Sequence, residues 1–504
     1  MTTTLRPAHE PSLNSLVPFR LDPFMFDGLP CYALVADSRQ VHAGMTFLAY
    51  PGEAVDGRSY IADAIGRGAR NVIWEKEGFH WPAAWTVPNR GVCRLRSQVS
   101  SLAGDVWGNP SQELRLWGVT GTNGKTTCSH WLAQILQAAG RRCALLGTLG
   151  NGFPGALEYA RLTTPDAIEV QQLLRRYIQE GAEAGVMEVS SHALAQDRVA
   201  GLTFRGAMFT NLTRDHLDYH GTMEAYGAAK ARMFADFDLD YALINRDDEW
   251  GSHLLAGLHG KRTQVVGYTR KERESTEDTL VLKSWCATEQ GMDFNIHSPW
   301  GEGSFHAHIM GEFNLSNLLA VIGAALLEGV SMTQIERLVA TLVPPAGRLQ
   351  RWGGGRLPWV VVDFAHTPDA LDQILRSLRQ WVAPQGMLWV IFGCGGQRDA
   401  GKRPLMGRVA EAIADRVVLT SDNPRDEVPA DILAQIQQGM NGSPYLVEED
   451  REQAIQLTLN QARVGDVVVI AGKGHETTQI LAQGEVRHFS DAAVVQAWLQ
   501  REGA

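Results

Sequence analysis

The amino-acid sequence predicts an α/β protein built from three domains. Its 504 residues correspond to about three domains of roughly 150 residues each. Apolar strand patterns alternate with helical patterns, which is typical of a mainly parallel sheet covered by helices. A Gly-rich phosphate-binding motif stands between an apolar strand pattern and a helical pattern at residues 118–127. A turn-forming Pro-Pro-Ala-Gly stretch at residues 344–347 precedes a second set of strand and helix patterns.

The first predicted domain, residues 1–112, is a small α/β unit. Short apolar segments at Cys31–Val35, Met45–Tyr50 and Asn71–Trp74 predict strands, and Tyr60–Ile65 has a helical pattern. We therefore expect a small α/β N-terminal domain in front of the phosphate-binding motif.

The central predicted domain, residues 113–345, starts with this motif. Strand and helix patterns alternate after it, which predicts a phosphate-loop-type, mainly parallel sheet with helices on its faces. Polar–apolar alternation over Thr279–His308 predicts an antiparallel insert, and Asn314–Glu328 predicts an amphipathic helix. The alternating segments are Leu114–Val119, Cys143–Leu146, Ala167–Gln179, Ala184–Glu188, Gly206–Phe209 and Tyr241–Asn245.

The third predicted domain, residues 346–504, has strand patterns separated by helices such as Asp369–Trp381. This arrangement predicts a C-terminal Rossmann-like open sheet. The strand patterns are Trp359–Phe364, Met387–Phe392, Arg416–Thr420 and Asp466–Ala471.

Composition and charge argue against several classes of function. The formal net charge is −10, which disfavours binding to nucleic acid or to an anionic membrane surface. The longest apolar runs are too short to span a bilayer, and Met1–Pro11 lacks the apolar core of a signal segment. The six cysteines form no Cys-x-x-Cys pair, so neither a zinc site nor a disulfide framework is indicated. We expect a cytoplasmic protein with no membrane insertion and no nucleic-acid partner.

The motif at residues 118–127 reads Gly-Val-Thr-Gly-Thr-Asn-Gly-Lys-Thr-Thr and predicts a nucleotide site. A strand, a Gly-rich turn and a helix N-terminus bring several backbone N–H groups and a positive dipole end to one point. Lys125 can then reach the terminal phosphates, and Thr126 can hold a Mg²⁺. The general motif has glycine where this chain has Val119, and Gly121 follows two residues later. This departure narrows the set of families to which the loop can belong.

Polar groups of the central domain follow strands or lie on helices, and each has a purely structural alternative. Glu188 ends an apolar strand, where it could hold Mg²⁺ or cap a helix. His216, in the loop Phe209–His220, could serve a second metal or be solvated. Lys230 lies on a helical stretch and could be a surface lysine, whereas Asn314 begins a helix and could cap it or contact a ligand.

Four loops of the third domain follow predicted strands and carry charged or Gly-rich sequence. Because the carboxyl ends of parallel strands lie at one edge of a sheet, we expect these loops to share one crevice. The loops are Asp363–Pro368, Phe392–Asp399, Ser421–Arg425 and Ala471–Glu476.

Taken together, these motifs resemble those of the Mur ligase family, the ATP-dependent amino-acid ligases of peptidoglycan synthesis. The resemblance covers nearly the whole chain, and within the family it is strongest to the ligases that add the third residue of the stem peptide. It rests on Gly121–Thr127, Glu188 with Ser190-Ser191-His192, Asn211–His220, Asn314, Arg348, Asp363–His366, Asp37-Ser38-Arg39, Thr163–Asp166, Asp422–Arg425 and Gly472–Glu476.

The resemblance implies that ATP phosphorylates a substrate carboxylate and that an amine then displaces phosphate to form an amide. Catalysis would depend on Lys125, Glu188, His216 and Lys230. Mg²⁺ would be bound by Thr126 and Glu188 at one position, and by His216 and a CO₂-derived carbamate on Lys230 at a second. The implied ATP contacts are Gly121, Thr122, Asn123, Gly124, Lys125, Thr126, Thr127, Asn314, Arg348 and Asp363.

The resemblance also implies a monomer that binds ATP, UDP-MurNAc-L-Ala-D-Glu and an amino-acid donor between domains that close around them. The hinges would lie near residue 112 and at Pro344–Gly347, and the uridine end would lie near Ser38 and Glu53–Val55. The implied contacts to the UDP-substrate are Ser38, Thr163, Thr164, Ser190, Gln196 and Arg198. The implied donor contacts are Arg398, Asp422, Asn423, Pro424, Arg425, Gly472 and Glu476.

The donor expected from the resemblance is meso-diaminopimelate, which differs from lysine by an extra carboxylate on the distal carbon. Arg425 matches the family position that reads this group, and a planar guanidinium suits a carboxylate through a bidentate pair. L-Lysine, which would leave Arg425 facing an ammonium, is the alternative donor.

Two other functions compete with this one. A folylpolyglutamate synthetase shares the phosphate loop and the acyl-phosphate chemistry, but the first 112 residues and the Asp422–Arg425 motif argue against it. A nucleotide-operated switch or binding module would have no use for the four charged loops of the third domain.

Overall fold

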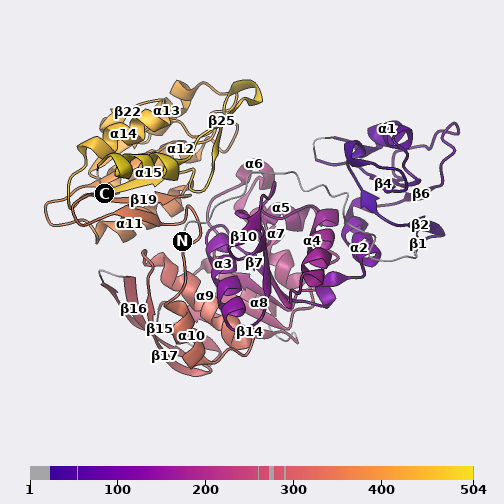
Figure 1. Cartoon of the computed structure of the whole chain (residues 1–504), viewed down its shortest axis with the longest axis horizontal. Helices are drawn as coiled ribbons and strands as arrows, with labels where there is room; N and C mark the ends of the chain where they lie inside the picture. Colours follow the sequence, from indigo (N-terminus) through magenta and orange to yellow (C-terminus); the bar gives the residue numbers. More distant parts are fainter. Residues whose placement is uncertain are drawn as a thin grey trace.

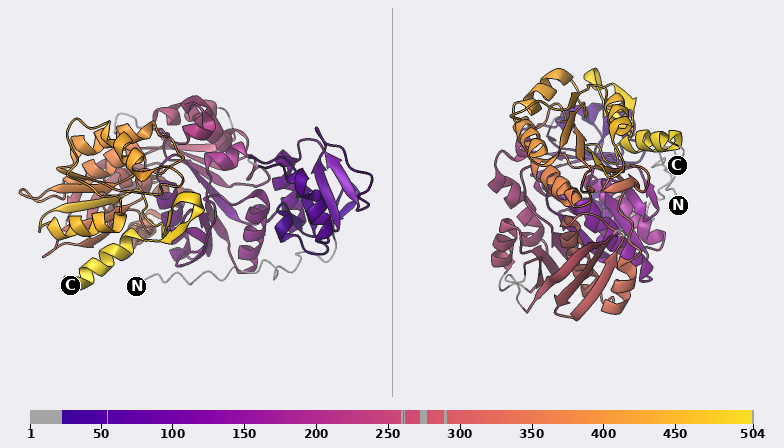
Figure 2. Two further views of the ribbon diagram at one scale, coloured as in Figure 1. Left: turned by 90° about the horizontal axis from the view of Figure 1, so that it is seen from above. Right: turned by 90° about the vertical axis from the view of Figure 1, so that its left-hand side faces the viewer.

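The computed structural model describes residues 23–53, 55–258, 260, 262–271, 277–288 and 291–502. Residues 1–22 of the predicted first domain, which include Met1–Pro11, lie outside the described residues, as do residue 54 and residues 503–504. Three α/β bodies lie in a row, and the one that carries the phosphate loop is in the middle (Figure 1, Figure 2). In the described part of the chain, no helix is long and apolar enough to cross a membrane.

The central sheet has eleven strands in the order β10-β9-β8-β11-β7-β12-β13-β14-β15-β16-β17. The seven strands from β8 to β15 in this order are parallel, and both ends of the sheet are antiparallel. The segment predicted as an antiparallel insert is β15 to β17, which extend this same sheet. The strands are β7 Arg115–Thr120, β8 Cys143–Gly147, β9 Gly150–Phe153, β10 Ala156–Glu158, β11 Ala184–Glu188, β12 Gly206–Phe209, β13 Tyr241–Asn245, β14 Gln264–Thr269, β15 Thr279–Thr288, β16 Gly291–Ser298 and β17 Gly301–Ala307.

Helices cover both faces of the central sheet, as the alternating pattern predicts. Leu116 and Trp117 point to opposite faces, and each joins a different hydrophobic cluster. The helices α3 Lys125–Ala138, α9 Phe313–Leu327 and α10 Met332–Val339 pack on one face. The helices α4 Ala167–Gln179, α7 Met223–Ala235 and α8 Glu249–Leu258 pack on the other, and the short helices α5 Ser191–Ala195 and α6 Leu217–His220 lie near the phosphate loop.

The helix α9 differs from the amphipathic helix that the sequence predicts. From Leu315 to Leu327 all its residues except Ser316 are buried, because α3, α10 and strands of the central sheet surround it. Its apolar residues therefore occupy its whole circumference, as expected of a core helix.

The third body is an open sheet of six strands in the order β18-β19-β23-β20-β21-β22, in which only β18 is antiparallel. The Rossmann-like prediction is confirmed by this topology with helices on both faces. The strands are β18 Gln350–Gly353, β19 Trp359–Asp363, β20 Leu388–Phe392, β21 Arg416–Leu419, β22 Leu446–Val447 and β23 Val467–Ala471. The helices are α11 Pro368–Arg379, α12 Lys402–Ile413, α13 Pro429–Gln437, α14 Arg451–Gln461 and α15 Asp491–Arg501, and a hairpin of β24 Thr478–Ile480 and β25 Val486–His488 follows β23.

The first body contains a parallel sheet of four strands in the order β3-β4-β5-β6. The predicted strand Cys31–Val35 is wrong as a single strand, because residues 29–31 pair in a hairpin and residues 34–35 pair with β4. A helix that the sequence did not reveal, α2 Leu95–Trp107, packs against α4 and joins this body to the central one. The other elements are β1 Phe24–Phe26, β2 Leu29–Cys31, β3 Leu34–Val35, β4 Thr46–Ala49, β5 Asn71–Glu75, β6 Asn89–Val92 and α1 Ile61–Gly66.

Candidate active site

The phosphate loop joins β7 to α3, and its geometry explains the unusual glycine. Gly121 has a φ of +148°, and a Cβ there would lie 1.9 Å from Thr210 Oγ1. Gly124 has a φ of +85°, and a Cβ there would lie 2.5 Å from Asn317 Oδ1. Only glycine fits such positions. The loop is therefore packed tightly between the end of β12 and the start of α9.

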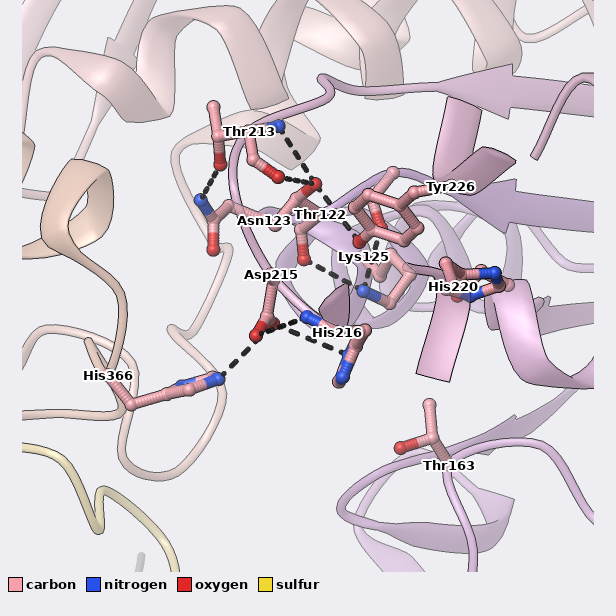
Figure 3. Close-up of polar contacts among 12 residues, drawn as sticks. Thr122, Asn123, Lys125, Thr163, Thr213, Asp215, His216, His220, Tyr226 and His366 are labelled. Carbon is pink, nitrogen blue, oxygen red and sulfur yellow. Dashed lines mark hydrogen bonds and ion pairs between the residues drawn. The ribbon is translucent and has the colours of Figure 1, made fainter. Parts of the chain in front are cut away.

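Two lysine side chains converge on one carbonyl group of this loop. Lys125 Nζ donates to Gly121 O at 2.9 Å and to Thr122 O at 2.8 Å, and Figure 3 shows this end of Lys125 beside Thr122. Lys230 Nζ donates to the same Gly121 O at 2.7 Å and lies 4.5 Å from the ring centroid of Tyr226. Burial lowers the pKa of Lys125, and burial followed by the charge of Lys125 lowers the pKa of Lys230 well below its ordinary value. The ammonium of Lys125 favours an anion nearby, whereas a second positive charge on Lys230 is disfavoured.

Glu188 lies where segments of two domains meet. Its buried carboxylate accepts hydrogen bonds from Thr126 Oγ1 at 3.0 Å, from Thr148 Oγ1 at 3.0 Å and from Thr148 N at 2.8 Å. Arg348 Nη2, at the start of the third domain, donates to Thr126 Oγ1 at 3.2 Å. The phosphate loop, a strand-end carboxylate and an arginine of the third domain therefore meet at one point.

A chain of hydrogen bonds continues from Glu188 to the residues predicted to hold the UDP-substrate. Thr164 Oγ1 donates to Glu188 O at 2.7 Å and to Ser190 Oγ at 3.3 Å. Arg198 Nη1 donates to Thr164 O at 3.1 Å, and Arg198 Nε donates to Gln196 Oε1 at 2.9 Å. Thr163 joins the same cluster, because its hydroxyl lies 3.1 Å from Thr148 Oγ1. The structure thus brings these predicted residues together beside the phosphate loop.

Asp215 lies between two imidazole rings, one from the central domain and one from the third domain (Figure 3). Its Oδ2 is 3.3 Å from His216 Nε2 and 3.6 Å from His366 Nε2 of the third domain. Burial lowers the pKa of His216 to about 3, so this imidazole is neutral. Burial alone raises the pKa of Asp215, but the hydrogen bond and charge of His366 hold that pKa far below its usual range. A neutral imidazole is the form of histidine that binds metals.

A cavity of about 430 Å³ lies between the central and third domains, next to the phosphate loop. Asn314, Arg348 and Asp363 are among the residues that line it. Asp363 accepts hydrogen bonds from Leu349 N at 2.7 Å and Ala365 N at 2.8 Å, and burial raises its pKa although the charge of Arg348 opposes this. A cavity of this size suits a ligand as large as a nucleotide.

The predicted donor residues lie in loops of the third domain that contact one another. Asn423 Nδ2 donates to Glu476 Oε2 at 2.9 Å, and Lys473 Nζ donates to Glu476 Oε2 at 2.8 Å and to Asn423 Oδ1 at 3.0 Å. Gly472 N donates to Asp363 O at 3.2 Å, which connects this cluster to the cavity wall. Loops that follow three of these strands therefore contact one another, as expected from their position at one edge of the sheet.

Arg425 stands at the edge of this cluster with a φ of +53°. Its Nη1 donates to Gly396 O at 2.7 Å, and Arg398 lies near enough that its charge helps burial to lower the pKa of Arg425. Among the described residues no carboxylate lies within ion-pair distance of Arg425. Asp422 and Pro424 hold the turn around it, because Asp422 Oδ1 accepts from Asn423 N at 2.7 Å and Pro424 O accepts from Glu427 N at 3.1 Å.

The first domain reaches this site from the opposite side. Tyr219 OH lies 3.4 Å from Glu53 Oε1, and Ser100 Oγ donates to Arg198 O at 3.1 Å. Ser38 is buried in a short 3₁₀ turn that Asp37 caps, and within the described part of the chain it makes no hydrogen bond to the cluster around Glu188. Ser38 is thus the one predicted site residue that stands apart.

The structural alternatives for three of these residues are wrong. Lys230 is only 1% exposed and is not a surface lysine. Glu188 caps no helix, because Ser190 is the N-cap of α5. Asn314 is the second residue of α9, its amide donates to Met310 O at 2.8 Å, and it does not cap the helix.

Thr148 is the residue of this site that the sequence analysis missed. It makes two of the three hydrogen bonds that Glu188 accepts through its carboxylate, and it follows directly after β8. The same rule that pointed to Glu188, a polar residue at the carboxyl end of a parallel strand, could have found it.

The fold and the site together define a three-domain enzyme that binds a nucleotide, and comparisons with known proteins identify its class. Three family models match: "Mur ligase family, catalytic domain" at residues 31–101, "Mur ligase middle domain" at 119–325 and "Mur ligase, glutamate ligase domain" at 347–474. The chain belongs to the Mur ligase family. Members of this family are ATP-dependent ligases that form amide bonds, so the prediction of such an enzyme is confirmed.

Individual relatives show which members of the family this chain is similar to. The UDP-N-acetylmuramoyl-L-alanyl-D-glutamate–2,6-diaminopimelate ligase of Chromobacterium violaceum is 47% identical over 479 residues, which are 94% of this chain and 96% of the relative. The ligase of the same name from Neisseria meningitidis is 45% identical over 494 residues. A solved structure of such a ligase is 36% identical with a TM-score of 0.67, covering 94% of this chain and 96% of that one. A folylpolyglutamate synthase of Mycobacterium tuberculosis, 18% identical with a TM-score of 0.62 over 75% of this chain, shares the fold alone.

Proposed function

We propose that this chain uses ATP to join meso-diaminopimelate to UDP-MurNAc-L-Ala-D-Glu in peptidoglycan synthesis. The observation that carries the proposal is the junction of Thr126, Glu188 and Arg348, where the phosphate loop meets the third domain. The relatives that are 45–48% identical over more than nine tenths of this chain are ligases named for these two substrates. Except for Ser38, the residues predicted for the UDP-substrate lie beside this junction, and the donor residue Gly472 contacts Asp363 in the cavity wall.

The reaction occurs in two steps at this junction. The D-Glu side-chain carboxylate attacks the γ-phosphorus of ATP, and the bond to ADP breaks to give an acyl phosphate. The donor amine then attacks the carbonyl carbon, inorganic phosphate leaves and a proton is lost. Lys125 and Arg348 balance the charge on the transferred phosphoryl oxygens, so catalysis rests on positioning and electrostatic stabilisation. The backbone N–H groups of Gly121–Thr127 hold the phosphates of ATP, while Asn314 and Asp363 contribute from the cavity wall.

The donor atoms at this junction fit Mg²⁺, which prefers oxygen ligands. Thr126 Oγ1 and Glu188 Oε2 lie 3.0 Å apart, and Thr148 also faces this carboxylate. We assign a first Mg²⁺ to Thr126 and Glu188, where it would neutralise charge on the phosphates. A second would be held by His216 and by Lys230 as a carbamate.

Carbamylation of Lys230 has a physical basis in its surroundings. A lysine ammonium cannot ligate a metal, whereas its CO₂ adduct is an anion that resembles a carboxylate. Only an uncharged amine reacts with CO₂, and the pKa of Lys230 is lowered by burial and by Lys125. The resulting anion would lie beside the ammonium of Lys125, which shares the Gly121 carbonyl with Lys230.

The remaining predicted residues bind the two other substrates. Thr163, Thr164, Ser190, Gln196 and Arg198 bind the muramyl-dipeptide part of the UDP-substrate, and Ser38 of the first domain binds its uridine end. Arg398, Asp422, Asn423, Pro424, Arg425, Gly472 and Glu476 form the donor site. Arg425 reads the distal carboxylate of meso-diaminopimelate, since the described residues offer it carbonyl groups but no carboxylate within ion-pair distance.

A comparison of amine donors tests this function. The purified chain is given ATP, Mg²⁺ and UDP-MurNAc-L-Ala-D-Glu, and kcat/KM is measured for meso-diaminopimelate and for L-lysine. We expect a preference of at least about 100-fold for meso-diaminopimelate, because L-lysine leaves a guanidinium without its carboxylate. Equal kcat/KM values for the two donors, or a preference for L-lysine, would contradict the assignment of meso-diaminopimelate. Phosphate release with a folate in place of the UDP-substrate would favour a folylpolyglutamate synthetase.

We also propose that the protein acts in the cytoplasm as a monomer. All three groups of substrate contacts are supplied by one chain, so a second copy is not needed to complete the site. Sedimentation equilibrium should give one mass near 55.3 kDa at all concentrations. A mass that doubles with concentration would contradict the monomer.

A further inference from the structure

His475 is a partly buried histidine that the proposed reaction does not use. It lies in the donor loop Gly472–Glu476, directly before Glu476, whose carboxylate faces Asn423 and Lys473. Its Nδ1 is buried and has no hydrogen-bond partner among the described residues. Burial, with the charge of Arg348 next, lowers the pKa of His475 to about 3, so the ring is neutral beside that guanidinium.

The backbone of the donor loop touches the segment that carries Arg348. A Cβ on Gly347 would lie 2.1 Å from His475 N, and a Cβ on Gly474 would lie 2.8 Å from Gly347 O. Gly347 and Gly474 have φ values of +65° and +54°, so both positions favour glycine. No side chain separates the two segments, so their backbones are in direct contact.

The ring of Phe364 forms a second connection between the same partners. The centroids of His475 and Phe364 are 5.2 Å apart, and Arg348 Cζ lies 4.5 Å from the Phe364 centroid. Arg348 in turn donates to Thr126 in the phosphate loop. Its Nε is buried without a partner in the part of the chain that the structure describes, so packing against Phe364 is a main restraint on the guanidinium.

We propose that His475 is a positioning residue that couples the donor site to the nucleotide site. Within one loop, Glu476 faces the donor, whereas His475 supports Phe364 and, through it, the arginine at the transferred phosphoryl group. Donor binding orders this loop and thereby fixes Arg348. This inference rests on the proposed function and adds to it a structural connection through which binding of the donor affects binding of the nucleotide.

Linked binding gives the test, because coupling between two ligands is reciprocal. The full chain is titrated calorimetrically with meso-diaminopimelate, in the presence of the UDP-substrate, with and without Mg²⁺ and a non-hydrolysable ATP analogue. In the unaltered protein the analogue should tighten donor binding by about 10-fold. In His475→Ala and His475→Asn, which lack the ring contact, this enhancement should fall to about 2-fold or less while donor binding without nucleotide stays unchanged.

Two further variants show which property of His475 matters. His475→Phe keeps an aromatic ring against Phe364 and should retain most of the enhancement. His488→Ala, at an exposed position of β25, should behave as the unaltered protein. At saturating ATP and UDP-substrate, kcat of His475→Ala should fall by about 10-fold and the KM for the donor should rise by about 5-fold, because donor binding loses its enhancement by nucleotide.

The outcomes separate this inference from the function on which it rests. If the unaltered chain neither binds meso-diaminopimelate nor forms the amide, both fail. If it does both, and His475→Ala and His475→Asn keep the full enhancement, the coupling role of His475 alone is overturned. A loss of donor affinity that is equal with and without nucleotide also overturns it, since it would mean a purely local role.

Discussion

At the scale of single residues, the two lysines that share the Gly121 carbonyl dominate the electrostatics of the site. Lys125 is needed as a cation that binds phosphate. Lys230 lies where burial and the charge of Lys125 disfavour its cationic form. Burial and the charge of Lys125 lower the pKa of Lys230, so a larger fraction of its amine is uncharged at a given pH. The uncharged amine is the form that reacts with CO₂.

Lys230 should therefore carry a carbamate that is required for activity. Protein equilibrated with ¹³C-labelled bicarbonate should show a carbamate carbon signal by NMR, and Lys230→Ala should lack it and lose about 100-fold or more in kcat. The exposed Lys76→Ala serves as the control and should keep both. A fully active Lys230→Ala would contradict the assignment.

Arg425 should determine recognition of the donor. Replacing it with alanine should raise the KM for meso-diaminopimelate by about 10–100-fold and change kcat and the KM for ATP little, because a charge-assisted hydrogen-bonded pair is lost. The exposed Arg356→Ala is the matched control. An Arg425→Ala variant with an unchanged donor KM would show that another group reads the distal carboxylate.

At the scale of elements, the phosphate loop depends on the close approach of its backbone to the end of β12. Gly121→Ala would place a methyl group 1.9 Å from Thr210 Oγ1 at a φ of +148°, so the loop must shift. We expect nucleotide binding to weaken by at least about 10-fold, measured by titration with ADP and Mg²⁺. Gly140→Ala also has a positive φ, +92°, but open space around its Cβ, and it should bind ADP normally. Normal binding by Gly121→Ala would contradict the proposed packing.

Sequence patterns predicted the elements of the two larger sheets well because apolar runs in parallel strands are buried on both faces. Ala184–Glu188, Gly206–Phe209 and Tyr241–Asn245 are strands with the predicted bounds. The patterns failed where tertiary contacts decide the outcome. The segment Cys31–Val35 is divided between two sheets, and α2 was missed although it joins two domains. Among site residues, strand-end position identified Glu188, whereas the contact between Gly347 and Gly474 joins segments too far apart in sequence to be predicted.

At the scale of the whole molecule, the site exists only where the domains meet. Thr126 and Arg348, Asp215 and His366, and Arg214 and Asp399 (3.2 Å) join the central and third domains. A ligand that binds across this junction stabilises both domains together.

Nucleotide with Mg²⁺ should therefore raise the thermal stability of the whole chain. At 100 times its Kd, a ligand adds about 2.7 kcal/mol to the free energy of unfolding, which corresponds to a rise in Tm of several degrees. Scanning calorimetry should show this rise with ADP and Mg²⁺, and EDTA should remove most of it. Glu188→Gln should show a smaller rise, and a rise that EDTA leaves unchanged would contradict a metal at this site.

The central claim is that the γ-phosphoryl group of ATP passes to the D-Glu carboxylate before the amine attacks. It is tested most directly with UDP-MurNAc-L-Ala-D-Glu labelled with ¹⁸O in that carboxylate. Mass spectrometry of the released inorganic phosphate should find one ¹⁸O atom per amide formed with meso-diaminopimelate. Amide formation with no ¹⁸O in the phosphate would contradict an acyl phosphate and the account of the site built on it.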